Sequence, residues 1–187
     1  MRPITAACVT LAILLSAAGA VWAGGATDEA VAQAKALVAQ RAALIPKLVA
    51  TIDNEAIFKD HPDEAKAIVA VLGDLQAAEA VPILVEHLGF EPHPSFHLPG
   101  FPDFPCAVAL AKIGAPAADA VVKQLAADDR ASFTVLEVLA RIDGRGLAAA
   151  RLSLAATRQL DPARQKRLEA AAELAKHLFE NVPEIKD

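Results

Sequence analysis

Three histidines and two carboxylates occur close together in the middle of the chain. They are His87, His93, His97, Glu91 and Asp103. Imidazole nitrogens and carboxylate oxygens are common ligands of zinc and other transition metals. However, prolines interrupt the segment that holds His93 and His97, so their four-residue spacing does not place them on one helical face. The His-Glu-x-x-His pattern of zinc enzymes does not occur either. The sequence therefore predicts no metal site and no cofactor.

Nucleophilic side chains give no catalytic pattern. Cys106 stands at the expected start of a helix, and an unpaired cysteine is usually a small buried apolar residue, so we expect that role for it. Ser95, Ser132 and Ser153 lie outside any Gly-x-Ser-x-Gly elbow. The segment 144–146, Gly-Arg-Gly, indicates a turn and not a phosphate-binding loop. We expect that the chain is not an enzyme.

A small basic cluster surrounds that turn. It consists of Arg141, Arg145 and Arg151. These side chains could pair with Asp128 and Asp129 or contact an anionic partner, and pairing is the ordinary case for charges on a helical surface. The chain as a whole has a net charge of -5 and no run of five basic residues. Nucleic-acid binding is therefore not expected.

The segment 89–105 is rich in aromatic residues, proline and histidine. It is longer than the 12–15 residues beyond which loops become uncommon and are often functional. Its phenylalanines could pack over helix ends and extend the core. Alternatively, some could remain exposed as a patch that a partner covers. The two roles do not exclude each other, because some of the phenylalanines could pack on the helices while others remain exposed. The candidate binding residues are Phe90, His93, Phe96, His97, Phe101 and Phe104.

Apolar residues recur at helical spacing on both sides of this segment, and no alternating strand pattern occurs. Apolar residues make up 55% of the chain and aromatic residues 4%, with alanine in excess, which suits closely packed helices. Asp161 and Pro162 are expected to start a charged final helix. The other expected helices are 28–40, 44–52, 60–75, 81–88, 104–113, 116–125, 135–142 and 147–160.

Two of these helix pairs repeat one pattern about 37 residues apart, within the period of helical repeat arrays. The pattern is clearest in the segment 71–74, Val-Leu-Gly-Asp, and in the segment 109–118. They resemble HEAT-like repeats, especially the short bacterial type also found in phycobilisome-lyase-like proteins. The resemblance covers Glu64 to Leu125. It implies a right-handed stack of antiparallel helix pairs that mostly serves as a binding surface. The expected fold is thus an all-α, right-handed α-solenoid of about four antiparallel helix pairs, without a sheet.

The first 23 residues have the layout of a secretory signal peptide. Arg2 precedes an apolar run from Ala6 to Ala18, and the segment 21–23, Val-Trp-Ala, offers a cleavage site. An uncleaved N-terminal anchor is the alternative. We expect residues 24–187 to form a single HEAT-like domain, exported to the periplasm or exterior of a bacterium, without stable membrane insertion after cleavage.

These features together predict an exported, non-enzymatic module that binds or scaffolds another protein or peptide. The segment 89–105 would make the contact, assisted by the inner face of the second helices of the pairs. The alternative function is a small-ligand or metal-binding carrier, or an enzyme, with a pocket at 89–105 centred on His93 and His97.

Overall fold

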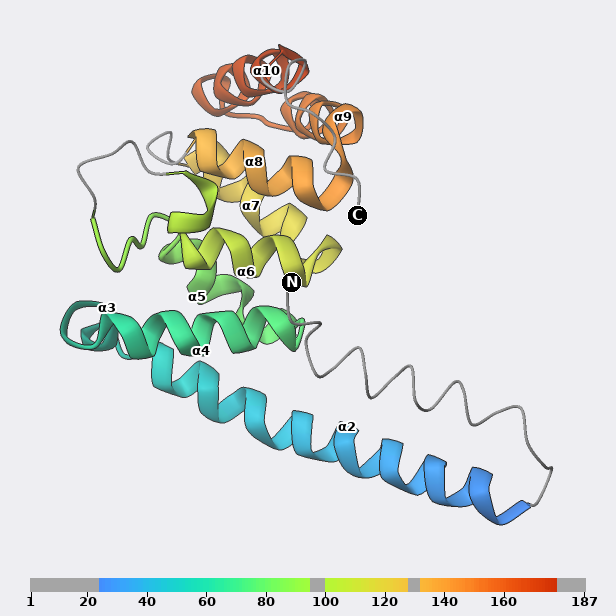
Figure 1. Ribbon diagram of the computed structural model, residues 1–187. Coiled ribbons are helices and arrows are strands. Elements are labelled where there is room, and N and C mark those ends of the chain that lie inside the picture. Colours follow the sequence, from blue (N-terminus) through green and yellow to red (C-terminus); the bar gives the residue numbers. More distant parts are fainter. Residues whose placement is uncertain (1–23, 95–99, 128–131, 178–187) are drawn as a thin grey trace, which may run out of the picture. The chain divides into compact units, whose positions relative to one another are not determined.

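The computed structural model describes residues 24–94, 100–127 and 132–177, and their regular elements are all helices (Figure 1). No described residue lies in a strand, so the predicted all-α fold class is confirmed. The described residues do not include the expected signal peptide. They also leave out Phe96, His97, Asp128 and Asp129. The elements are α2 (Gly24–Ile52), α3 (Ala56–Asp60), α4 (Pro62–Asp74), η2 (Ala78–Ala80), α5 (Val81–Glu86), η3 (Phe101–Asp103), α6 (Pro105–Ile113), α7 (Ala115–Ala127), α8 (Ser132–Asp143), α9 (Arg145–Thr157) and α10 (Pro162–His177).

The chain divides into two compact units, residues 1–41 and residues 42–187. The expected helix pair 28–40 and 44–52 is wrong, because α2 continues without a break from Gly24 to Ile52. The segment 41–43, Arg-Ala-Ala, contains only good helix formers and no residue that ends a helix. Pro46 lies inside α2 and leaves one backbone hydrogen bond unmade, yet the helix persists around it.

Helix ends in the second unit follow familiar local chemistry. Pro62 occupies the first turn of α4, followed by the acidic side chains of Asp63 and Glu64, which suit the positive end of the helix dipole. Gly114 ends α6 with a φ of 79°, a left-handed conformation that glycine adopts without strain. These signals explain why α4 and α6 begin and end close to the residues that the sequence predicts.

The helices of the second unit pack in two neighbouring rows. α4 contacts α6, and α6 contacts α8, so these three lie one above another (Figure 1). α5 contacts both α6 and α7, and α7 contacts α8. Their facing sides bury a common apolar core. Its largest fully buried side chains include Leu72, Leu84, Leu110, Val121 and Leu136.

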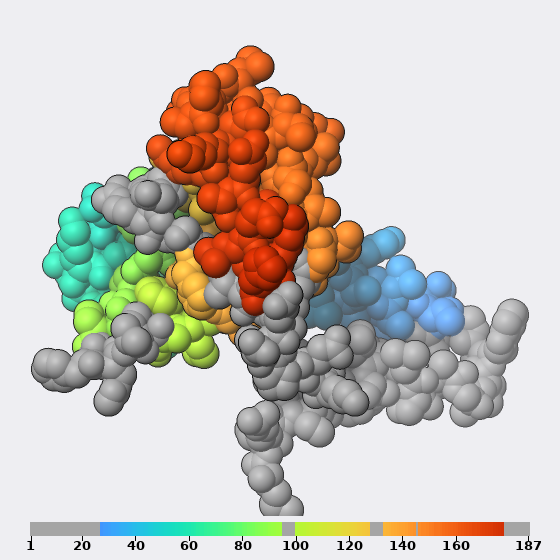
Figure 2. Space-filling view, turned by 90° about the horizontal axis from the view of Figure 1, so that it is seen from above, coloured from blue at the N-terminus to red at the C-terminus, as the bar shows by residue number. Residues whose placement is uncertain are grey.

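At the C-terminal end, α9 contacts both α8 and α10. The sequence predicts that α8 and α9 form the fourth pair and that α10 closes the array. In the structure α9 contacts α8 but packs more extensively on α10, and α10 itself reaches α7. Figure 2 shows α9 and α10 at the surface of this end.

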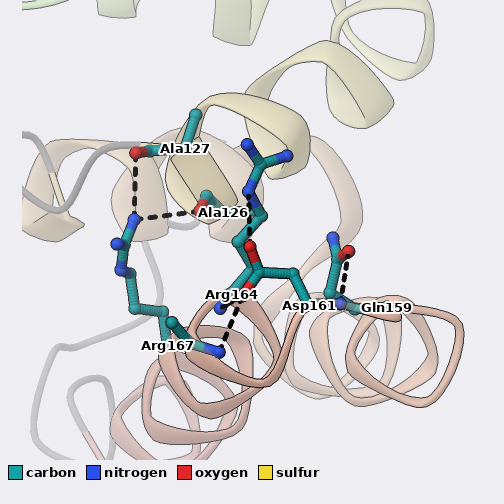
Figure 3. A network of polar contacts seen from close by, with 7 residues as sticks. Ala126, Ala127, Gln159, Asp161, Arg164 and Arg167 are labelled. Atoms are coloured by element: carbon teal, nitrogen blue, oxygen red, sulfur yellow. Dashed lines mark hydrogen bonds and ion pairs between the residues drawn. The ribbon is translucent and has the colours of Figure 1, made fainter.

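Polar contacts fix the position of α10. Arg167 donates hydrogen bonds from Nη1 to the carbonyls of Ala126, at 3.0 Å, and Ala127, at 2.9 Å, and so caps the end of α7 (Figure 3). Asp161 accepts hydrogen bonds from the backbone N–H groups of Arg164 and Ala163, and these bonds lower the pKa of its carboxyl.

Candidate functional site

The segment 89–94 is held against α3. The ring of Phe90 meets that of Phe58 edge-on, with centroids 4.9 Å apart, and Phe58 stacks on His87 at 3.9 Å. Phe90 is half-buried and packs against the core. His87 therefore takes part in aromatic packing, and Phe90 anchors the first end of the insert.

His93 lies at the surface beside the start of α4. Its Nε2 is 2.9 Å from Oδ1 of Asp63, and both side chains are mostly exposed. An exposed pair of this kind contributes little stability. The described residues bring no second histidine to this pair, and they contain no group of three His, Cys, Asp or Glu side chains arranged as metal ligands.

The second end of the insert, residues 100–104, is held more tightly. Phe101 is only 8% exposed, and the guanidinium carbon of Arg141 lies 4.2 Å from the centre of its ring. Phe104 is half-buried against the core. Three of the four candidate phenylalanines thus pack on the helices, while Phe96 and His97 lie outside the described residues.

A hollow of about 120 Å³ opens beside this second end, between α4 and α6. Lys112 lines it, with Nζ 2.6 Å from Oδ1 of Asp74. Lys66 also lines it and has no ion-pair partner within the described part of the chain. The other side chains that line the hollow are apolar. Its lining residues are Lys66, Ala70, Pro102, Pro105, Val108, Ala109 and Lys112.

No pattern in the sequence indicated this hollow. Its residues come from α4, η3 and α6, and only the packing of α6 against α4 and η3 brings them together. The two lysines gave no signal because each is the single basic residue of its helix. The inner face of the second helices was expected to assist binding, whereas this hollow lies on α4 and α6, the first helices of the expected pairs.

A second hollow, of about 380 Å³, lies between α9 and α10. Ser153 and Lys176 are its polar side chains, and Lys176 Nζ is 2.5 Å from Oε1 of Glu173. The rest of the lining is glycine and alanine, so this hollow offers no acid, base or nucleophile beyond these two groups. The remaining lining residues are Gly146, Ala149, Ala150 and Ala175.

Two arginines of the cluster, Arg141 and Arg151, pair with carboxylates of the described helices, while the expected partners Asp128 and Asp129 lie outside the described residues. Arg151 makes two hydrogen bonds to Asp143, of 2.5 and 3.0 Å, and a third of 2.8 Å to Asp119. The bonds to Asp143 raise the pKa of the Arg151 guanidinium. Arg141 pairs with Glu137 at 2.9 Å. These contacts tie α7, α8 and α9 together, which is a structural role.

Cys106 is fully buried in α6, as predicted. Burial raises the pKa of its thiol to about 12, so the thiol is protonated at neutral pH. A protonated, buried thiol is a poor nucleophile, so Cys106 serves the core.

The described residues form an all-helical protein, and the two hollows described above are lined mainly by apolar side chains, with lysines and Ser153 as the polar ones. None of the described helices has the length and apolarity required to cross a bilayer. No protein-family model matches the chain, and neither a curated protein nor a solved structure is significantly similar to it.

Proposed function

We propose that this chain is an exported, non-enzymatic binding module, built as a right-handed solenoid of HEAT-like repeats, that holds a segment of another protein. The contacts of α4 with α6 and of α6 with α8 support this, as do those of α5 with α7, because stacked helix pairs have this pattern. Such an array offers an extended surface on which a polypeptide can lie.

The hollow between α4 and α6 carries the proposal. Pockets for small molecules usually measure about 300–1,000 Å³. A space of about 120 Å³ is smaller and fits a side chain of a bound polypeptide better than a whole metabolite. Its apolar lining suits an aliphatic or aromatic side chain.

The charges that line the hollow define the partner further. Lys66 and Lys112 line it together with apolar side chains, and the Lys66 amine has no competing carboxylate in the described part of the chain. A bound segment would therefore carry an apolar side chain next to an acidic one. The insert 89–105 would flank this segment, since Pro102 and Pro105 line the hollow.

The alternative function, a carrier or enzyme with a pocket at 89–105, receives less support. Phe101 is buried in the core, and Phe90 and Phe104 pack against it, so these rings are not available to line a pocket. The larger hollow lies elsewhere, between α9 and α10, and presents few polar groups to fix a small ligand.

Affinity capture from the native compartment tests the proposal with one matched pair of variants. Lys66→Glu reverses the charge at the hollow, and Lys123→Glu makes the same change at an exposed position of α7. We expect the wild type and Lys123→Glu to retain the same protein, and Lys66→Glu to lose about 90% of it. Equal recovery by all three would overturn the assignment of the site. Capture of no protein would overturn the function.

A further inference from the structure

The N-terminal part of α2 exposes a set of large apolar side chains. Val31 is 51% exposed, Leu37 63% and Val38 66%. An amphipathic helix gains most of its stability by burying its apolar face, and a free helix of this length is marginal in water. These side chains therefore form a surface that packing would stabilise.

The same side of the helix is used for packing further along. Val31, Val38, Ile45 and Ile52 follow one another at seven-residue intervals. Ile45 is 2% exposed and Ile52 is fully buried. A seven-residue repeat keeps apolar side chains along one seam that faces a partner helix. The exposed residues Val31 and Val38 therefore continue the line of the buried residues Ile45 and Ile52, with the spacing of a helix–helix contact.

The order of charges along α2 indicates how a partner would lie. Asp28 and Glu29 come first, and the basic side chains Lys35, Arg41 and Lys47 follow. Two parallel copies of this helix would place like charges level with each other. Two antiparallel copies would place the acidic end of each beside the basic part of the other, and would also oppose their helix dipoles.

We propose that residues 27–41 of α2 bind the same residues of a second copy of this chain, antiparallel, through the part of this seam that Val31 and Val38 form. The resulting dimer joins two binding modules through their N-terminal helices. A membrane surface is a weaker candidate for this seam. Helices that lie on membranes carry a strongly basic polar face, whereas in residues 27–41 the acidic Asp28 and Glu29 balance the basic Lys35 and Arg41.

Oligomeric state tests the proposal directly. The wild-type chain, purified after export and confirmed by N-terminal sequencing, is expected to sediment as a dimer at micromolar concentration. Val38→Glu should weaken dimerisation about tenfold or more. Ala36→Glu also introduces a glutamate, at an exposed position on the side of α2 opposite the seam, and should leave dimerisation unchanged. A monomeric wild type overturns the proposal, as does a monomer that binds anionic vesicles.

Cysteine cross-linking tests the direction of the two helices. The segment 27–41 has its midpoint at residue 34, so Ala34→Cys should form a disulfide across the dimer. In Ala30→Cys the two cysteines would be separated by eight helical residues, about 12 Å along the axis, which is too far for a disulfide. Parallel helices would cross-link both variants. Cross-linking of both, or of neither, overturns the antiparallel arrangement. The wild type serves as the control, because its Cys106 is buried.

Discussion

Gly73 of α4 lies directly against Ala109 of α6. A methyl group added at Gly73 would come within 2.9 Å of the Cα atom of Ala109 and 3.1 Å of its Cβ atom. The two helices therefore approach each other as closely as their backbones permit, and the hollow lined by Ala70 and Val108 lies beside this contact. The candidate binding surface thus depends on a glycine for its geometry.

Gly73→Ala should lower the free energy of unfolding by about 1–2 kcal/mol. Overpacking costs about 1–3 kcal/mol, and the better helix propensity of alanine returns up to about 1 kcal/mol. Gly146→Ala is the matched control, because nothing lies within 4 Å of an added methyl there. Its stability should be unchanged or slightly raised. Urea unfolding of both variants measures the difference, and equal stabilities would contradict the close contact of α4 and α6.

Replacing Arg151 with methionine should cost about 1–3 kcal/mol, because the partly buried carboxylate of Asp143 loses its two hydrogen bonds. Asp119→Asn removes the other partner of the same arginine. Since the Asp119 side chain is 93% exposed, that change should cost about 1 kcal/mol at most. Thermal unfolding ranks the two variants. A larger loss for Asp119→Asn would mean that the contact to Asp143 is not the principal one.

Phe101→Ala should destabilise the chain by about 3–5 kcal/mol, as expected for a buried phenylalanine, and should release the Arg141 side chain that covers the ring. Phe133 of α8 is 55% exposed, and Phe133→Ala should change stability by about 0.5 kcal/mol or less. Chemical denaturation compares the pair. A stable Phe101→Ala variant would show that the insert does not anchor through this ring.

The buried thiol of Cys106 predicts a dependence of stability on alkaline pH. Its pKa is raised from 9.0 to about 12, so the folded state disfavours the thiolate while the unfolded state ionises freely. Below the pKa that the thiol has in the unfolded state, its contribution to the free energy of unfolding does not change with pH. Stability should then fall between pH 9 and 12, by up to about 1.4 kcal/mol per pH unit, relative to Cys106→Ala. Denaturation at several pH values measures this, and parallel curves for the two proteins would refute it.

The helices could be predicted because local signals define them. Asp63 and Glu64 follow Pro62 at the start of α4, and Gly114 ends α6. The break expected between the helices 28–40 and 44–52 failed because the residues at 41–43 favour a helix and none of them ends one. Contacts between distant residues were not predictable. Arg151 and Asp119 are 32 positions apart, and the hollow joins residues of α4 with residues of η3 and α6.

Site-specific photo-cross-linking tests the central claim most directly. A photoreactive phenylalanine analogue at Ala70, in the hollow between α4 and α6, is compared in living cells with the same residue at Ala170, an exposed position of α10. A protein adduct of defined mass at position 70 and none at position 170 is the predicted result. No adduct at position 70, or the same adducts at both positions, would contradict the claim that this hollow binds a polypeptide.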